Sequence, residues 1–437
     1  MNASDHENLP RDTQPADLIL HSAGQVCTLR GGVQRGEQLG DLGIIVDGAI
    51  AIRDGNILAV DHSAVVLSKF SSSRMIDASG YVITPGFVDP HTHLVWAGDR
   101  AAEFEQRVAG ASYMEIMHAG GGIVSTVRST RQAGLDELVE AGQARAHRML
   151  QHGTTTAEAK TGYGLELDTE LKLLQAIIQV DEQSEIELSP TFLAAHAVPP
   201  EYQTEQSGGT EAYTKLVAQE MLPALLSWWQ ENAADRALPF VDVFCEQGAF
   251  SLDQSRMILE AARELGFPLK IHADEFEGLG GTGLAISLGA VSADHLVQTP
   301  DEDIRNLGAG DTVAVALPCT PFGLAEREYT PATDIIAANG ILAIATDLNP
   351  GTAWCESMQM AIALATRYMG ITPAQALAAA TINAAAAIGR SQTVGSLEPG
   401  KQADLLLLDI PDYRHLGYRF GTNLVSKTMK RGQFITL

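Results

Sequence analysis

Histidine and carboxylate side chains recur in this chain where apolar runs end, and their types point to metal chemistry. His91 and His93 follow the run ITPGFVDP, and His272 and Asp347 come at the ends of two later runs. Residues i and i+2 of a strand face the same side, so His91 and His93 can share one ion. Three imidazoles and one carboxylate suit Zn²⁺ or Fe²⁺/Fe³⁺ better than Mg²⁺ or Ca²⁺. Such an ion activates water at neutral pH, so the predicted chemistry is hydrolysis.

Other run ends carry further polar side chains of the same kind. His196 ends one run, Glu275 stands three residues after His272, and His295 ends another run. A single HxH pair is a weak signal, because such pairs are more often structural. Five run ends that carry histidine or acidic side chains form a more specific pattern, which favours one site built by several strands.

The elements that would position these side chains alternate along the middle of the chain. Eight apolar runs of strand character are separated by stretches of helical periodicity, among them 135–152, 170–182, 212–231, 252–265 and an Ala-rich stretch at 373–388. This alternation predicts a parallel sheet, and eight units predict a closed (β/α)₈ TIM-like barrel with its site at the carboxyl ends of the strands. The runs are GFVDPHTHL, TTTAEAKTG, SPTFLAAH, FVDVFCEQGAF, LKIHADEF, GAVSADHL, TVAVALPC and ILAIATDL.

The two ends of the chain differ from this middle. From about 17 to 81 and from 395 to 437, apolar runs are short, rich in β-formers and bounded by turn residues. The first of these stretches is predicted to form antiparallel sheet. Two β-rich ends around an α/β barrel predict a small β-sandwich domain built from both termini. The predicted division assigns 1–82 and 391–437 to this domain and 83–390 to the barrel.

Charge and cysteine usage restrict the partners and the compartment. The chain has 29 Lys and Arg against 54 Asp and Glu, a net charge of −25, which argues against nucleic acid and anionic membranes as partners. The four cysteines are far apart and form no CxxC pair, and the polar opening has no signal-peptide pattern. We therefore expect a cytoplasmic protein in which any anionic substrate is held by local cations.

The barrel motifs resemble those of the imidazolonepropionase family of amidohydrolases. In chain order they are VITPGFVDPHTHLVWAGDR, KTGYGL, FLAAHAVP, KIHADEFEGLGG, ADHL and ATDLNPGT, and the similarity covers about 16–437. The SLEPGKQADLLLLD segment resembles the terminal domain of amidohydrolases in general, so it does not select the substrate. The resemblance implies hydrolysis of the cyclic amide C–N bond of 4-imidazolone-5-propanoate to N-formimidoyl-L-glutamate, in histidine degradation, by a homodimer.

The resemblance also implies roles for individual residues. Four side chains would hold one metal ion, namely His91, His93, His272 and Asp347. Asp347 would also be catalytic, together with Glu275 as general base and His295, which would orient the water or polarise the reacting carbonyl. For His295, a purely structural histidine is the competing interpretation.

The remaining matched positions would bind a small anionic heterocyclic substrate. Its carboxylate arm needs a fixed cation in so acidic a protein, and Arg100, seven residues past His93, can make a bidentate contact. The other positions that the resemblance places around the substrate are Tyr163, His196, Glu275, Asn349, Gly351 and Thr352.

The number of metal ions follows from an absent lysine. Dinuclear members of the superfamily bridge two metals through a carboxylated lysine on the fourth strand, and the run FVDVFCEQGAF has none. Lys160 belongs to the second run, which is the wrong place for that role. A single metal is therefore predicted.

Three alternatives remain at this point. Another mononuclear amidohydrolase, such as a deaminase of a nucleobase-like ring, would share the metal ligands but would not need Arg100. A non-catalytic barrel used in protein assembly would not need to keep all four ligands. The glycines of 278–283 fit the GxGxxG pattern of dinucleotide-binding proteins, but Asp274 and Glu275 precede them and would repel a pyrophosphate.

Overall fold

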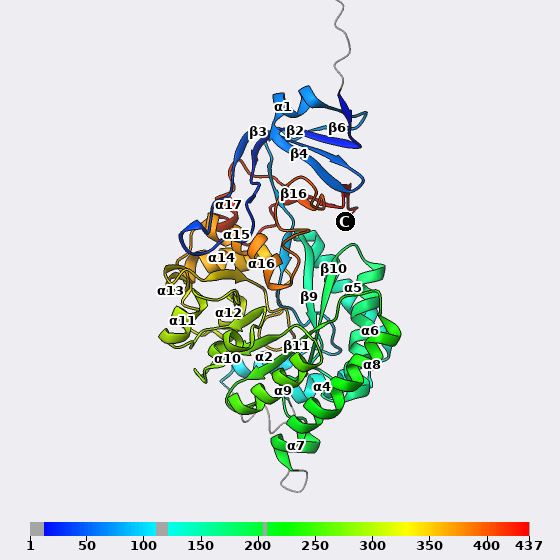
Figure 1. Ribbon diagram of the computed structural model, residues 1–437, viewed down its shortest axis with the longest axis vertical. Coiled ribbons are helices and arrows are strands. Elements are labelled where there is room, and N and C mark those ends of the chain that lie inside the picture. Colours follow the sequence, from blue (N-terminus) through cyan, green and yellow to red (C-terminus); the bar gives the residue numbers. More distant parts are fainter. Residues whose placement is uncertain (1–12, 111–120, 204–207, 437) are drawn as a thin grey trace, which may run out of the picture.

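Eight parallel strands form the barrel that the alternating runs predict (Figure 1). The computed structural model describes residues 13–110, 121–203 and 208–436. The strands are neighbours in chain order, and each coincides with one predicted run, so the predicted fold class is confirmed. They are β8 (Phe87–Asp89), β9 (Thr154–Lys160), β10 (Glu187–Ala195), β11 (Phe240–Cys245), β12 (Lys270–Ala273), β13 (Ser292–His295), β14 (Val313–Ala316) and β15 (Ile341–Ile344).

The barrel closes between its first and last strands, and this closure places two of the candidate ligands. β8 ends before Pro90, which has no N–H to donate to a ladder. The segment after Pro90 makes the contact with the last strand, where the carbonyl of His91 accepts a hydrogen bond from the backbone N–H of Asp347 at 3.1 Å. His91 and His93 were expected on the strand itself, whereas they follow it. This bridge nevertheless holds them beside the segment that carries Asp347.

Amphipathic helices cover the outside of the barrel (Figure 1). In α5, for example, the buried positions Leu138, Ala146 and Met149 recur at helical spacing and face the strands. The helices of this layer are α4 (Ile123–Gln132), α5 (Leu135–Gln151), α6 (Leu167–Gln183), α7 (Gly209–Leu216), α8 (Leu222–Asn232), α9 (Leu252–Glu264), α10 (Gly281–Leu288), α11 (Asp301–Leu307), α13 (Ala332–Ala337) and α14 (Met358–Tyr368). Within the described residues, none of the helices has both the length and the apolar character required to cross a bilayer.

Two of the predicted helices are interrupted. The stretch 212–231 contains a π-helical segment, Val217–Met221, shortly before Pro223, whose missing N–H breaks the regular hydrogen-bond ladder. The Ala-rich stretch forms two helices, α15 (Pro373–Ala379) and α16 (Ile382–Ala387). The break between them leaves the carbonyl of Ala380 to accept the backbone N–H of Val88 in β8 at 3.0 Å.

Both ends of the chain contribute to a second eight-stranded sheet. Its order is β18-β17-β16-β7-β2-β3-β4, with β6 also paired to β2. The expectation of antiparallel pairing is only partly right, since β6 and β7 run parallel to β2 after the helix α1 (Ser63–Lys69). The strands are β2 (Leu18–Val26), β3 (Ile45–Arg53), β4 (Asn56–His62), β6 (Met75–Asp77), β7 (Val82–Pro85), β16 (Leu405–Leu408), β17 (Val425–Lys430) and β18 (Gln433–Phe434). The division of the chain into domains stays a prediction.

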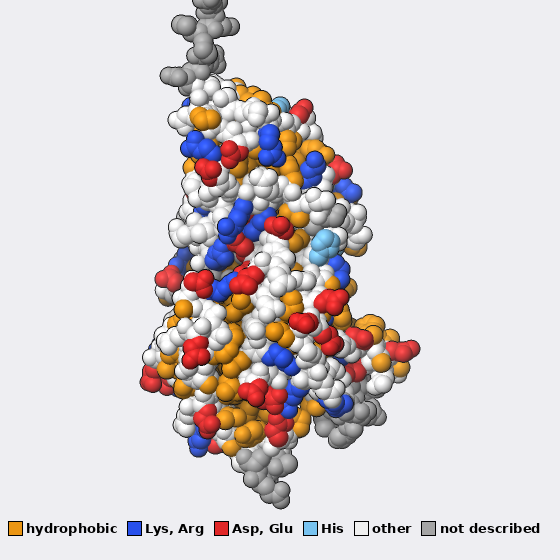
Figure 2. Space-filling model, turned by 90° about the vertical axis from the view of Figure 1, so that its right-hand side faces the viewer, with side chains coloured by type: hydrophobic (Ala, Val, Ile, Leu, Met, Phe, Trp, Pro, Cys, Tyr) orange, Lys and Arg blue, Asp and Glu red, His pale blue; other side chains and the backbone are white. Residues whose placement is uncertain are grey.

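The terminal sheet lies against the amino-terminal ends of the barrel strands. Glu187, the first residue of β10, accepts a hydrogen bond from Arg390 at 2.6 Å and from Arg431, which follows β17, at 2.8 Å. Lys430 Nζ lies 3.4 Å from the same carboxylate. Positive and negative side chains alternate on the face where sheet and barrel meet (Figure 2). The helices α2 (Ala101–Val108), α4 and α7 lie at the opposite end of the barrel (Figure 1).

Replacing Glu187 by Gln should reduce stability in a pH-dependent way. Burial alone would raise the pKa of Glu187, but Lys430, Arg431 and Arg390 lower it from 4.5 to about 2. A lowered folded-state pKa contributes stability above the unfolded value, which is lost as the pH falls through the folded value. The contribution at pH 7 is about 3 kcal/mol, and it fades as the pH falls from 4.5 towards 2.

Urea denaturation of the wild type and of Glu187→Gln at pH 7 and pH 3 measures this difference. The gap in unfolding free energy should be large at pH 7 and smaller at pH 3. Glu211→Gln is the control, because its partner Lys215 is exposed and such pairs contribute less than about 1 kcal/mol. An equal gap at both pH values would contradict the role of the ionised Glu187.

Candidate active site

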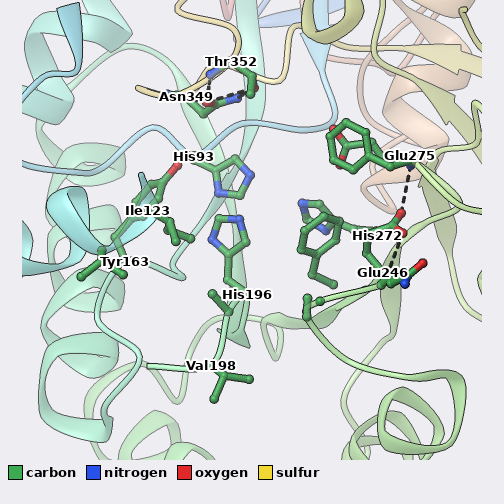
Figure 3. A pocket seen from close by; sticks show the side chains of 18 of the residues that line it. His93, Ile123, Tyr163, His196, Val198, Glu246, His272, Glu275, Asn349 and Thr352 are labelled. Carbon is green, nitrogen blue, oxygen red and sulfur yellow. Dashed lines mark hydrogen bonds between the residues drawn. The ribbon is translucent and has the colours of Figure 1, made fainter. Parts of the chain in front are cut away.

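A cavity of about 940 Å³ opens at the carboxyl ends of the barrel strands. Its lining consists of histidines at strand ends and of residues from loops, and side chains from several elements face one another across it (Figure 3). Every residue predicted to bind substrate is among them. The predicted site residues in its lining are His93, Arg100, Tyr163, His196, His272, Glu275, His295, Asp347, Asn349, Gly351 and Thr352. His91 is fully buried behind this surface.

The four predicted metal ligands come together at the floor of the cavity, where His93, His272 and Asp347 line it and His91 lies behind them. Asp347 Oδ1 lies 3.4 Å from His91 Nε2 and 3.7 Å from His93 Nε2. The ring centroids of His91 and His272 are 4.5 Å apart. Among the described residues, ligand atoms within 4.8 Å of one another form three groups that contain His91: one with His93 and Asp347, one with His272 and His295, and one with Glu158 and Asp294. The geometry thus also brings His295 within reach of a cation, which the sequence did not indicate.

The chemistry of these donors fits a bound cation. His91 Nε2 and His272 Nε2 are buried and make no hydrogen bond within the described structure. Burial, together with nearby positive and imidazole groups, lowers the pKa values of His91 and His93 well below the ordinary range. Neutral imidazoles offer lone pairs, and burial raises the pKa of Asp347 to about 6. A buried cluster of unpaired nitrogen lone pairs beside a carboxylate is the donor set that a transition metal prefers.

Two aspartates behind the cluster orient its histidines. Asp294 Oδ2 on β13 lies 2.7 Å from His91 Nδ1, and Asp242 Oδ2 on β11 lies 2.9 Å from His272 Nδ1. The contact of His91 is a hydrogen bond, whereas that of His272 is an ion-pair distance, because His272 Nδ1 makes no hydrogen bond within the described structure. In both rings Nε2 is left for the cluster. We did not predict either aspartate as a site residue. The signal was present, because a carboxylate within an apolar strand run is rarely buried without a partner.

Glu275 and His295 lie next to each other at the edge of the cluster. Glu275 Oε1 lies 3.5 Å from His295 Nδ1. Burial and the carboxylates of Asp347 and Glu246 raise the pKa of Glu275 well above its usual range. His295 has a φ of +82° and Asp347 a φ of +54°, conformations that non-glycine residues adopt at a cost and that cluster at functional sites. The backbone therefore supports a functional interpretation of His295 over a purely structural one.

Arg100 is fixed at the cavity wall by its neighbours. Its Nε donates to Glu103 at 2.7 Å. Its guanidinium packs over Gly351 so closely that a Cβ at Gly351 would collide with it. A glycine at position 351 therefore allows the predicted substrate loop to pass close to the Arg100 guanidinium.

Tyr163 and His196 form the wall beside His93. The rings of His93 and His196 are stacked with centroids 4.8 Å apart (Figure 3). His196 Nδ1 donates to the carbonyl of Gly162 at 3.0 Å, which leaves Nε2 as an acceptor. Burial lowers the pKa of His196 to about 3 and raises that of Tyr163. Both side chains are therefore neutral polar groups beside the cluster.

The loop after β15 is organised by Asn349. Its Oδ1 accepts the backbone N–H groups of Gly351 and Thr352, each at 2.8 Å, and its Nδ2 donates to Thr352 Oγ1 at 2.9 Å. These contacts use most of its hydrogen-bonding capacity. Asn349 thus shapes the loop that borders the cavity.

The sequence analysis did not predict several lining residues, and three of them have contacts or charges that matter for the site. Glu246, after β11, accepts the backbone N–H of Phe276 at 2.9 Å and so holds the loop that carries Glu275. Phe244 packs edge-on against His272 with ring centroids 5.7 Å apart. Arg107 on α2 lines the entrance. Glu246 directly follows the apolar part of the fourth run and was open to prediction, whereas nothing in the sequence separates Arg107 from an ordinary surface arginine.

Backbone N–H groups of the glycine run at 278–283 are bound by a carboxylate of the protein itself, that of Asp274. Asp274 accepts the backbone N–H groups of Gly280, Gly281 and Thr282, at 3.1 to 3.2 Å, at the start of α10. A helix N-terminus that would attract a phosphate is thus already satisfied. This arrangement speaks against the dinucleotide alternative.

Comparison with known proteins agrees with the geometry. The model of the amidohydrolase family matches residues 82–435. An adenosine deaminase from Xanthomonas campestris with bound zinc is 20% identical with a TM-score of 0.66, covering 97% of this chain and 93% of that structure. A 5-methylcytosine deaminase from Klebsiella pneumoniae is 16% identical with a TM-score of 0.70, covering 96% and 97%. At these identities the two structures show the shared fold alone, and the family model shows that the chain is an amidohydrolase.

Much closer relatives define the family within this class. The imidazolonepropionase of Herpetosiphon aurantiacus is 52% identical over 420 residues, 96% of this chain and 97% of the relative. That of Chloroflexus aggregans is 50% identical over 426 residues, 97% and 99%. The chain belongs to the imidazolonepropionase family. The predicted function and enzyme class, a hydrolase of a cyclic amide C–N bond, are thereby confirmed.

Proposed function

We propose that the chain hydrolyses 4-imidazolone-5-propanoate to N-formimidoyl-L-glutamate with the residues of this cavity. One observation carries this assignment of roles. Arg100, the carboxylate of Glu275 and the four predicted metal ligands, which we call the His/Asp cluster, all meet at one cavity. Water oxygen bonds to the ring carbonyl carbon, the C–N bond breaks, one proton of the water moves to the leaving nitrogen, and the other is released to solvent as the new carboxyl group ionises. The products of that cleavage are a carboxylate and a formimidoyl amine in one molecule.

The metal centre is the first part of this proposal. His91, His93, His272 and Asp347 would hold one divalent ion, Zn²⁺ or Fe²⁺/Fe³⁺, as their unpaired nitrogen atoms suggest. When bound, the ion would supply Lewis acidity, which lowers the pKa of water from 15.7 to about 7. Lys160 lies on β9 and not on the fourth strand, in keeping with a single ion.

Proton transfer is assigned to Glu275. Its raised pKa suits a group that takes a proton from the attacking water and passes it to the ring nitrogen that leaves. His295, 3.5 Å from Glu275, orients the water or stabilises the negative charge on the reacting oxygen. Glu246 keeps the loop of Glu275 in place through the N–H of Phe276.

Substrate binding is assigned to the residues of the opposite wall. Arg100 holds the propanoate, since it is the cation fixed between Glu103 and the loop of Gly351. The ring lies between Tyr163 and His196 on one side and the loop of Asn349, Gly351 and Thr352 on the other. Neutral Tyr163 and His196 provide hydrogen bonds without adding charge.

Replacing Arg100 by Met should weaken binding of the substrate. A hydrogen bond to a charged group contributes about 1.5 to 3 kcal/mol, so KM should rise about 10- to 100-fold. Steady-state kinetics with 4-imidazolone-5-propanoate measure the change. An imidazolone without the carboxylate is the matched control, and its kinetic constants should not respond. An unchanged KM for the propanoate substrate would refute this role of Arg100.

Hydrolysis by the metal-reconstituted protein tests the proposed function as a whole. Loss of ring absorbance is followed for 4-imidazolone-5-propanoate and for the carboxylate-free ring. Rapid loss of the propanoate substrate alone supports both the reaction and the anion site. No loss from a protein with metal bound would overturn the substrate and return attention to ring deaminases with the same fold.

The setting of the enzyme is also a proposal. A cytoplasmic location is supported by four free cysteines, and a small anionic substrate, rather than nucleic acid or membrane, is supported by the net charge of −25. A homodimer is proposed from the family resemblance. Light scattering during size-exclusion chromatography measures the mass and decides the last point.

A further inference from the structure

Five charged side chains are fully buried beneath the His/Asp cluster, and none of them belongs to the proposed ligands. Two are lysines and three are carboxylates. They are Glu158, Lys160, Asp242, Lys270 and Asp294. Buried charges are costly unless they are paired, so a group of this size in a barrel interior calls for a reason.

Lys160 occupies the centre of this group. Its Nζ lies 2.7 Å from Asp242 Oδ2, 2.9 Å from Glu158 and 3.5 Å from Asp294 Oδ2. The residue ends β9, while the two aspartates come from β11 and β13. One ammonium group therefore links three barrel strands at the level of the cluster.

The oxygen atoms that contact Lys160 are the same ones that face the histidines. Asp242 Oδ2 lies 2.9 Å from His272 Nδ1, and Asp294 Oδ2 lies 2.7 Å from His91 Nδ1. Each oxygen thus lies between one imidazole and the ammonium of Lys160, and Asp294 Oδ2 also lies 3.8 Å from Lys270 Nζ. Among the described residues, no Lys or Arg other than Lys160 forms an ion pair with Asp242.

We propose that Lys160 is a positioning residue for the metal centre, which sets the orientation of His91 and His272 together through Asp294 and Asp242. This inference rests on the proposed metal site. The ammonium holds the two carboxylates at fixed places, and each carboxylate holds the Nδ1 side of one ring, so that both Nε2 atoms converge. Loss of Lys160 leaves Asp242 Oδ2 without its cation, while Asp242 Oδ1 still accepts the backbone N–H groups of Val243 at 2.7 Å and His272 at 3.1 Å. The effect on the two rings is therefore expected from the Oδ2 atoms, whose positions the ammonium no longer fixes.

Direct metal binding tests the proposal without relying on turnover. Zn²⁺ affinity is measured by competition with a chromophoric chelator, and the coordination geometry by the visible spectrum of the Co²⁺ form. Lys160→Met should weaken Zn²⁺ binding by about 10- to 100-fold, the usual effect of losing an outer partner of a metal ligand, and should change the Co²⁺ spectrum. Lys160→Gln, which keeps one donor, serves if the Met variant does not fold, with the same direction expected.

Lys430→Met separates positioning from general stability. Lys430 is also buried, and its Nζ lies 2.6 Å from Asp404 in the terminal sheet. Its replacement should lower the melting temperature and leave both metal readouts unchanged. A folded Lys160 variant with wild-type Zn²⁺ affinity and an unaltered Co²⁺ spectrum would overturn the proposal. Failure of the wild type to bind Zn²⁺ or Co²⁺ would instead overturn the proposed metal site.

Discussion

Asp347→Asn is expected to abolish turnover and metal binding together. The carboxylate is the only anion among the proposed ligands, and its Oδ1 faces both His91 and His93. A neutral amide in its place removes the charge that balances a cation and offers a poorer donor. A metal ion supplies several kcal/mol of charge stabilisation, so kcat should fall by about 10³-fold or more. Metal analysis of the purified variant and turnover after reconstitution measure the two losses.

Asp89→Asn is the matched control for this experiment. Asp89 is equally buried and accepts hydrogen bonds from the N–H and the hydroxyl of Thr346, at 3.1 and 2.5 Å. It does not line the cavity, and burial raises its pKa to about 7, so that an amide resembles its protonated form. Its metal content should stay at the wild-type level. An Asp347→Asn protein that is active without metal would refute the proposed mechanism.

Glu275→Gln is expected to separate catalysis from metal binding. The amide has the shape of the carboxylate but cannot take up the proton of the attacking water. Loss of a general base lowers kcat by about 10²- to 10⁴-fold. Because Glu275 is not one of the proposed ligands, the metal content should be unchanged and KM should change little. Single-turnover kinetics of the reconstituted variant measure the chemical step directly.

The same exchange two residues later provides the control. Glu277 is exposed, whereas Glu275 faces the cavity next to His295. Glu277→Gln should leave kcat within about twofold of the wild type, since a surface substitution of this kind rarely matters. A Glu275→Gln enzyme with wild-type kcat would assign the proton transfer to another group, and His295 would be the first to examine.

The barrel was predictable because its signals are local. The runs VAVA of β14 and ILAI of β15 are buried along their whole length, which is how parallel strands covered on both faces read in a sequence. The break between α15 and α16 was not predictable. Alanines stand on both sides of the break, and the carbonyl that it leaves free accepts the backbone N–H of Val88, in a strand far away in the sequence. The parallel pairing of β6 and β7 with β2 likewise depends on contacts that no local pattern contains.

The site residues also fall into those that local sequence signals predicted and those that depend on distant contacts. The ligand types and their places at strand ends were visible, since His and Asp in such positions have few structural uses. Asp242 and Asp294 stood out as carboxylates within apolar runs, but which ligand each one contacts was not visible, because that depends on the lateral register of the sheet. Phe244 pairs with His272 between β11 and β12, and this register brings Asp242 within 2.9 Å of His272. Lys160 was noticed only as a lysine on the wrong strand, and its neighbours became known with the structure.

The joining of β7 to β16 has a consequence for how the protein is made. Leu405 in β16 pairs with Pro85 in β7, so the residues of the whole barrel must leave the ribosome before this ladder can form. Until then β7 presents an unpaired edge beside apolar residues of the terminal sheet, a state that favours association between nascent chains. The order of synthesis therefore makes the barrel the scaffold on which the terminal sheet is completed.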